Sequence, residues 1–273
     1  MELRVEAVSK VYGSGADARQ ALAPTSLTLE ENEFVSIVGP SGCGKSTLLM
    51  MMAGLLEPTS GTVWLDGEQI TGPSRGLAVV FQDYSRSLFP WMTVGRNLSM
   101  ATAATKLPKA VVAERVEHAL TSVGLEGSAS LYPWEMSGGM QQRVAIARAL
   151  VVEPKVMLMD EPLAAVDAQT RADLEDLVLA VRKEYEVTVA FVTHDIDEAV
   201  YLGDRVVVLQ ANPGRIRAEV DVPLERPRDQ VRTKIDPLFA QLRAEVFGMV
   251  MRPGSPGPGG APRAHAPSGS PGR

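Results

Sequence analysis

Alternation of apolar and polar residues is the first regularity of this chain. Leu3, Val5 and Ala7 are apolar at every second position near the amino end, and Leu27 and Leu29 repeat that spacing. Successive side chains of a β-strand point to opposite faces, so the spacing predicts short strands that each bury one face. Gly, Ser and Asp residues between them favour turns, and we therefore expect antiparallel strands before position 35.

Further along the chain, continuous apolar runs replace this alternation. The runs at 34–38, 77–81, 156–159, 188–193 and 205–209 have the length of strands that are buried on both faces. The segment GTVWLDGEQI, residues 61–70, predicts a hairpin that turns at Asp66-Gly67. Residues 216–222 predict an edge strand after a turn at 212–214.

Helical patterns separate several of these strands. The run from Thr47 to Leu56 is apolar almost all round, which is typical of a helix buried under a sheet. Further helices are predicted within 94–104, 109–123, from Ser137 past Leu150, from the expected N-cap Asp167 to about Tyr185, and over 227–247 with an interruption near Pro237. Strands that alternate with helices predict an α/β protein. The helices between 86 and 150 predict a helical insertion in it.

Composition narrows the classes of protein that remain. The chain has 273 residues, of which 45% are hydrophobic and 22% charged, as in ordinary globular proteins. No apolar run approaches the roughly 18 residues of a membrane span, and the amino end has no secretory core, so we expect a cytoplasmic protein. The single cysteine, Cys43, excludes an internal disulfide. The net charge of −6 argues against a nucleic-acid partner bound through phosphate contacts.

The carboxyl end differs in composition from the rest of the chain. Residues 251–273 are rich in Pro and Gly and lack apolar periodicity. Such a segment cannot bury enough apolar surface to fold, so we expect a disordered tail after a domain at 1–250.

The strongest chemical signal is FVSIVGPSGCGKST at 34–47, which contains the pattern G-x-x-x-x-G-K-S between a predicted strand and a predicted helix. Gly39, Gly42 and Gly44 allow backbone conformations that direct successive N–H groups at one anion. The helix start adds the positive end of its dipole. Lys45 can reach the outer phosphates, and the Ser46 hydroxyl can ligate Mg²⁺. The alternative is an ordinary strand–turn–helix corner, but the full pattern favours a nucleoside triphosphate site.

Polar residues follow three of the predicted buried strands. Gln82, the pair Asp160-Glu161 and His194 each stand where a strand ends, which is where ligands meet a parallel sheet. Adjacent carboxylates are costly to bury without a cation. In a P-loop protein that cation is Mg²⁺, which Asp160 would hold while Glu161 orients or deprotonates water. The alternatives are ordinary loop polarity for Gln82 and a structural role for His194.

Three other features have both a functional and a structural interpretation. Ser137-Gly138-Gly139 at a helix start is a second arrangement that can bind an anion, or simply an N-cap and a flexible entry. Tyr12, in a predicted turn, either stacks on a base or packs locally. The aromatic cluster around Pro90 either contacts another protein or contributes to local packing.

Together, residues 39–47, Gln82, SGGMQQR at 137–143, MLMDEP at 157–162, Asp167 and His194 resemble the ATP-binding subunit of an ABC transporter. The resemblance covers about residues 1–245, and SGGMQQR distinguishes this family from other P-loop proteins. It implies an α/β P-loop NTPase fold with a RecA-like core, an N-terminal antiparallel β subdomain and an inserted α-helical subdomain. It also implies ATP and Mg²⁺ as cofactors.

The resemblance assigns a role to each matching residue. Lys45 and Thr47 match phosphate ligands, and the nucleotide-binding loop also contains Gly39, Pro40, Ser41, Gly42, Cys43 and Gly44. Ser46, Gln82 and Asp160 match Mg²⁺ ligands, some through water. Glu161 resembles the general base that activates water, and His194 resembles the switch residue that contacts the γ-phosphate. Tyr12 matches the aromatic that stacks on adenine, and Asp167 belongs with the nucleotide-binding set.

Ser137, Gly138 and Gly139 match the signature loop, which in this family completes the site of a second subunit. The loop has neither a lysine nor a carboxylate pair beside it, so it can recognise ATP without hydrolysing it. Two chains joined head to tail around two ATP molecules would close with ATP and open after hydrolysis. The expected partners are therefore a second copy of the chain, separate integral membrane permease subunits and, indirectly, a solute-binding protein.

Two further segments resemble one subfamily. FQDYSRSLFPW at 81–91 and ANPGRIRAEVDVPLERPRD at 211–229 are similar to importers of nitrate, aliphatic sulfonates, taurine and related solutes. This similarity implies a peripheral subunit on the cytoplasmic face of the membrane that couples ATP hydrolysis to uptake of a small anion. The alternatives are another solute, an exporter, a soluble ABC ATPase linked to DNA maintenance or ribosomes, and a P-loop kinase, which has no use for SGGMQQR.

Overall fold

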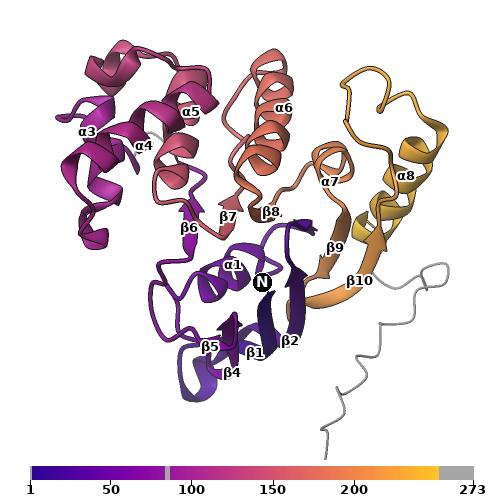
Figure 1. The fold of residues 1–273 in the computed structure, drawn as a ribbon. Helices are drawn as coiled ribbons and strands as arrows, with labels where there is room; N and C mark the ends of the chain where they lie inside the picture. Colours follow the sequence, from indigo (N-terminus) through magenta and orange to yellow (C-terminus); the bar gives the residue numbers. More distant parts are fainter. Residues whose placement is uncertain (1, 84–86, 252–273) are drawn as a thin grey trace, which may run out of the picture.

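The computed structural model describes residues 2–83 and 87–251 of the chain (Figure 1). Within them the strands form a four-stranded sheet in the order β2-β1-β4-β5 and a six-stranded sheet in the order β10-β9-β3-β8-β7-β6. Residues 252–273 of the expected tail, and 84–86 of the subfamily segment, lie outside the described residues.

The smaller sheet is antiparallel, as the alternation predicts. It contains β1 (Glu2–Tyr12), β2 (Arg19–Glu30), β4 (Ser60–Leu65) and β5 (Glu68–Gln69), the last two forming the predicted hairpin. β1 and β2 are longer than the short strands expected. Ala7, expected on the same face as Leu3 and Val5, is exposed instead. Its φ of 47° coincides with a register shift in the pairing of β1 with β2, and this bulge moves the buried face to Val8.

The larger sheet contains the predicted buried strands. They are β3 (Phe34–Val38), β6 (Leu77–Val80), β7 (Val156–Asp160), β8 (Thr188–Val192) and β9 (Arg205–Gln210), which pair in parallel, and the antiparallel edge strand β10 (Arg215–Asp221). Parallel pairing brings the carboxyl ends of β3, β6, β7 and β8 to one edge of the sheet.

The helices connect these strands. They are α1 (Lys45–Met52), α3 (Val94–Ala101), α4 (Lys109–Ser122), α5 (Gly138–Leu150), α6 (Ala168–Tyr185), α7 (Ile196–Leu202) and α8 (Pro237–Met251), with 3₁₀ turns at Gly15–Asp17, Ala103–Thr105, Ser128–Ser130 and Pro133–Glu135. α1 ends at Met52 rather than Leu56, and Gly54 follows with a φ of 68°. α7 was not predicted. No helix within the described ranges combines the length and apolarity that crossing a bilayer requires.

The larger sheet is covered on both faces. Val35 and Ile37 of β3 pack with α1 and the antiparallel sheet, whereas Phe34 and Val38 face a second core that includes α5, α6, α7 and α8. In Figure 1, α3, α4 and α5 gather beside the β6 end of the molecule, and they lie between β6 and β7 in the chain. The boundaries of the domain and of the helical insertion remain predictions.

Candidate nucleotide-binding site

The loop between β3 and α1 is tightly folded and has little room for side chains. A Cβ on Gly39 would lie 2.6 Å from the carbonyl oxygen of Leu209 and 2.8 Å from the Cys43 Sγ atom. Gly44, the N-cap of α1, has a φ of 93°, which side-chain-bearing residues rarely adopt. The glycine positions singled out from the sequence are therefore required by close approach and by backbone conformation.

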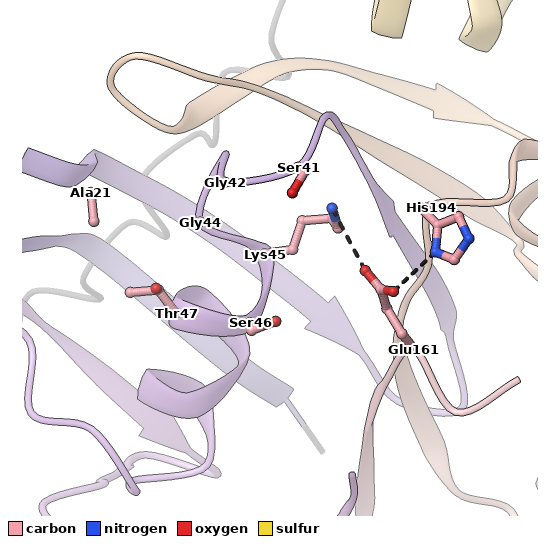
Figure 2. A pocket seen from close by; sticks show the side chains of 9 residues that line it. All are labelled: Ala21, Ser41, Gly42, Gly44, Lys45, Ser46, Thr47, Glu161 and His194. Atoms are coloured by element: carbon pink, nitrogen blue, oxygen red, sulfur yellow. Dashed lines mark hydrogen bonds and ion pairs between the residues drawn. The ribbon is translucent and has the colours of Figure 1, made fainter. Parts of the chain in front are cut away.

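A cavity of about 410 Å³ opens over this loop (Figure 2). Its lining residues are Ala21, Ser41, Gly42, Gly44, Lys45, Ser46, Thr47, Glu161 and His194. They come from β2, from the loop and α1, and from the segments after β7 and β8. The fold thus brings the predicted lysine, hydroxyls, carboxylate and imidazole to one cavity.

Lys45 is held at the mouth of the loop by main-chain oxygens. Its Nζ atom donates to the carbonyl oxygen of Gly39 at 2.9 Å and lies 3.5 Å from that of Pro40. The Lys45 side chain is 7% exposed, and Nζ is 3.9 Å from the Glu161 Oε1 atom. An ammonium group in this position can contact a phosphate bound by the loop.

Ser46 and Asp160 form an oxygen pair that fits Mg²⁺. The Ser46 hydroxyl donates to Asp160 Oδ1 at 2.9 Å. Burial raises the pKa of the Asp160 carboxyl, and the Ser46 hydrogen bond opposes that effect. Mg²⁺ prefers oxygen ligands and would offset the cost of burying this carboxylate. Within the described ranges no group of three or more His, Cys, Asp or Glu residues could hold a metal ion.

Glu161 lies between Lys45 and His194 (Figure 2). Its Oε2 atom is 2.9 Å from the Nδ1 atom of His194, and Gln82 Nε2 lies 3.5 Å from the same oxygen. The backbone of Glu161 has a φ of 44° and donates its N–H to Val192 at 2.9 Å. Such a conformation is uncommon for a residue with a side chain.

The signature residues do not line this cavity. Ser137 caps α5 and accepts from the Met140 N–H at 3.3 Å. A Cβ on Gly139 would lie 2.6 Å from the Thr170 side chain, and the Thr170 hydroxyl donates to Asp167 Oδ2 at 2.7 Å. Ser137, Gly139 and Asp167 therefore belong to a second cluster, where α5 and α6 begin. Asp167 is the N-cap of α6, as predicted, and the N–H and hydroxyl of Thr170 lower the pKa of its carboxyl.

Tyr12 is also outside the lining of the cavity. It is the last residue of β1 and pairs with Arg19, so its placement in a turn is wrong by one residue. Its side chain is 45% exposed, and the Lys10 ammonium lies 5.5 Å from the centre of its ring. An adenine-binding role for Tyr12 remains a prediction.

Two residues of the site had no signal in the side-chain pattern. Ala21 of β2 lines the cavity, and its carbonyl oxygen accepts from the Gly214 N–H at 3.1 Å. The carbonyl oxygen of Gly214 in turn accepts from the Ala23 N–H at 2.8 Å, and a Cβ on Gly214 would lie 2.1 Å from the carbonyl oxygen of Cys43. Backbone contacts of this kind tie β2 and the phosphate loop together.

Glu198, which lies on α7 shortly after His194 in the chain, was missed together with that helix. It is 4% exposed and accepts from the Thr193 hydroxyl at 2.6 Å, and Arg171 Nε lies 3.4 Å from its other oxygen. Burial raises the pKa of Glu198 to about 7. The residue fixes the turn from β8 to α7 that carries His194.

A phosphate loop with a buried lysine, a hydroxyl–carboxylate pair suited to Mg²⁺ and a second carboxylate at the cavity wall define a P-loop nucleoside triphosphatase. The family model described as "ABC transporter" matches residues 22–164. The chain belongs to the ABC transporter family and is an ATPase of that family.

Relatives of known sequence agree with this assignment. The chain is 47% identical to an uncharacterized ABC transporter ATP-binding protein of Methanocaldococcus jannaschii, over 92% of this chain and 91% of that protein. It is 42% identical to the aliphatic sulfonates import ATP-binding protein SsuB of Bacillus licheniformis, over 90% and 93%. It is 44% identical to a bicarbonate transport ATP-binding protein of Synechococcus elongatus, over 89% of this chain and 37% of that longer protein.

Solved structures share the fold. A dimeric ATP-binding cassette in a post-hydrolysis state with ADP and Pi matches with a TM-score of 0.70 and 33% identity, over 81% of this chain and 98% of that one. The cbiO1 protein of Clostridium perfringens, part of the ABC transporter complex cbiONQ, matches with a TM-score of 0.74 and 29% identity, over 92% and 95%.

Proposed function

We propose that this chain is the ATP-hydrolysing subunit of an ABC importer for a small anion. The observation that carries the proposal is the position of Glu161, whose carboxylate lies 3.9 Å from the Lys45 ammonium and 2.9 Å from His194 at the nucleotide cavity. A carboxylate next to the phosphate loop is within reach of a water molecule that attacks the γ-phosphate.

Each residue of the cavity then has a chemical task. The loop N–H groups, Lys45 and Thr47 would bind the phosphates of ATP. Mg²⁺, when bound by Ser46 and Asp160 with Gln82 nearby, would offset the negative charge of the phosphates. Glu161 would accept the proton of the attacking water, and His194 would hold the Glu161 carboxylate and contact the γ-phosphate.

We further propose that two chains assemble head to tail. The cluster of Ser137, Gly139 and Asp167 lies apart from the cavity, although an exposed helix start with free N–H groups suits a phosphate. The dimeric cassette among the structural matches supports this arrangement. Each ATP would then lie between Lys45 of one chain and the α5 start of the other.

The variant Glu161→Gln tests the catalytic part of the proposal. We expect hydrolysis to fall by about 10²–10⁴-fold, because the general base is lost while ATP binding remains. The variant should then accumulate as a dimer with Mg²⁺–ATP in light scattering. Glu114→Gln, an exposed change on α4, is the matched control and should hydrolyse ATP at the parental rate. A Glu161→Gln protein that stays monomeric with ATP, or hydrolyses it normally, would refute the role of Glu161.

Mixing two inactive variants tests the head-to-tail geometry. Lys45→Ala disables the loop of one chain, and Ser137→Arg blocks the α5 start of the other. A mixed dimer pairs one intact loop with one intact α5 start, so mixing equal amounts should restore roughly a quarter of the parental activity. A mixture as inactive as its components would show that the two elements do not form a shared site.

The importer part of the proposal rests on the surface before α3 and on the relatives. Trp91 is 67% exposed and packs against Phe89, and buried Asn97 holds this segment through its backbone. We propose this surface as the contact with a permease, which would keep the chain on the cytoplasmic face of the membrane. Co-fractionation of the chain with membranes should require the permease and should weaken in Trp91→Ala.

The solute is proposed as a small anion of the sulfonate, taurine, nitrate or bicarbonate kind, since relatives are named for sulfonate and bicarbonate transport. A solute-binding protein encoded beside the permease should bind one of these anions. Binding of an unrelated solute, such as a sugar or a cation, would overturn this proposal and leave the ATPase assignment intact.

A further inference from the structure

A second cavity of about 700 Å³ lies at the carboxyl end of α6. Arg182 and Lys183 of α6 contribute to its wall, and Arg226 and Arg228 contribute from the segment after β10. The apolar part of the wall comes from Leu179, Ala180 and Pro227. Ligand cavities of this size are typically apolar with a few polar groups that fix the ligand.

This cavity is distinct from the nucleotide site. Asn32, which precedes β3, is part of its wall, whereas the nucleotide cavity lies beyond the carboxyl end of β3. The two cavities have no lining residue in common. None of the residues given a role in ATP hydrolysis belongs to this cavity.

The positive charges around the cavity exceed the carboxylates that pair with them. Asp204 accepts hydrogen bonds from both Arg182 at 2.6 Å and Arg226 at 2.6 Å, so one carboxylate serves two guanidinium groups. Of the acidic wall residues, Asp176 accepts from the Tyr201 hydroxyl at 2.6 Å, and Glu186 is exposed at the end of α6. Neither forms an ion pair with an arginine of the cavity among the contacts described.

Arg228 forms no ion pair in the part of the chain that the structure describes, and the charge of Asp204 acts on it only without direct contact. Its side chain is only 9% exposed, and it donates to the carbonyl oxygens of Glu225 at 3.1 Å and Gly203 at 3.2 Å. Its Nε–H is buried without any acceptor. Burial, reinforced by the charge of Arg226, lowers the pKa of the Arg228 guanidinium to about 10. A buried cation bonded only to neutral groups is costly, and an anion in the adjoining cavity would offset that cost.

We propose that this cavity binds a small organic anion, in which a carboxylate, sulfonate or phosphate group is attached to an apolar body of several carbon atoms. The anionic group pairs with Arg228, and Lys183 at the exposed rim adds a second positive charge. The apolar body packs on Leu179, Ala180 and Pro227. Binding here depends neither on the transported solute nor on the dimer.

Hexanoate is a suitable probe, because it has both an anionic group and an apolar body. Its affinity should be measured by titration calorimetry on the full chain with saturating Mg²⁺–ADP, so that the phosphate loop is already occupied. Hexanoate should bind measurably in the millimolar range or tighter. Acetate, which lacks the apolar body, and hexanol, which lacks the anion, should each bind at least about tenfold more weakly.

Variants locate the binding. Arg228→Gln should weaken hexanoate binding by about tenfold or more, since a charge-assisted hydrogen bond is lost. Ala180→Phe changes an exposed residue and fills the apolar part of the cavity, so it should abolish binding without unfolding the chain. Arg243→Gln removes an exposed charge on α8 and is the matched control, which should bind like the parent. No binding by the parent, or equal binding by parent and Ala180→Phe, would overturn the proposal even if Arg228→Gln fails to fold.

Discussion

Glu198 makes the stability of this protein depend on pH in a direction opposite to that of most surface carboxylates. The residue is 4% exposed, and burial raises its pKa from 4.5 to about 7. The folded state therefore binds the Glu198 proton more tightly than the unfolded state does. Stability from this group is fully present below about pH 4.5 and is lost as the pH rises through 7.

The magnitude follows from the size of the shift. At about 1.4 kcal/mol per pKa unit, deprotonation of Glu198 in the folded chain costs about 3 kcal/mol. Neighbouring groups are included in this shift: Asp195 and Glu175 raise the pKa, whereas the Thr193 hydroxyl and Arg171 lower it. Glu198→Gln keeps the shape of the side chain and its hydrogen bond from Thr193 but cannot ionise. We expect this variant to match the parent near pH 5 and to exceed its stability by up to about 3 kcal/mol at pH 8.

Urea unfolding at pH 5, 6, 7 and 8 measures this difference. The free energy of unfolding of the parent should fall relative to Glu198→Gln across the series, and Glu114→Gln, on an exposed face of α4, should follow the parent. Other groups titrate in both proteins and cancel in the comparison. A constant difference between parent and Glu198→Gln from pH 5 to pH 8 would refute the assignment of a raised pKa to Glu198.

Three further substitutions or modifications have clear expected outcomes. Gly214→Ala should destabilise the chain by about 1–3 kcal/mol in urea unfolding and weaken ATP binding, because the new Cβ would lie 2.1 Å from the Cys43 carbonyl oxygen. Gly248→Ala, where a Cβ meets nothing within 4 Å, is the control. Iodoacetamide should label Cys43 only slowly in the native state, because the thiol is fully buried and burial raises its pKa. Once Cys43 is labelled, the loop should no longer bind ATP, and ATP binding retained after complete labelling would contradict this expectation. Asn97→Ala should lower the free energy of unfolding by about 1–3 kcal/mol and loosen the segment around Trp91, since buried Asn97 hydrogen-bonds the backbone of Phe89, Met92 and Thr93. An unchanged free energy of unfolding would argue against this role of Asn97.

Local signals were enough to predict most elements and the chemical residues of the cavity. α6 begins directly after Asp167 and ends at Tyr185, as its cap and apolar spacing indicate. Lys45, Ser46 and Glu161 meet at one cavity because parallel strands bring their carboxyl ends to the same edge. These predictions succeed because each depends on a side-chain type at a fixed spacing.

The missed features have different physical origins. α7 has only seven residues, two of them acidic in its first turn, and so short a helix shows no apolar period. The exposed position of Ala7 results from a bulge, which interrupts the alternation without changing the residue types around it. The contact of Gly214 with Ala21 and Cys43 is made by main-chain atoms from distant segments, and side-chain patterning does not encode it.

The position of Ala21 has a consequence for how the lining of the nucleotide cavity can change in this protein. Ala21 comes from the antiparallel sheet, whereas the lysine, hydroxyls, carboxylate and imidazole of the cavity come from the larger sheet and its connections. The backbone of Gly214 hydrogen-bonds to Ala21 and Ala23 of β2, beside the apolar core in which side chains of the two sheets pack together. A substitution at Ala21 would therefore change the lining of the cavity on the side of the antiparallel sheet and leave Lys45, Ser46 and Glu161 in place.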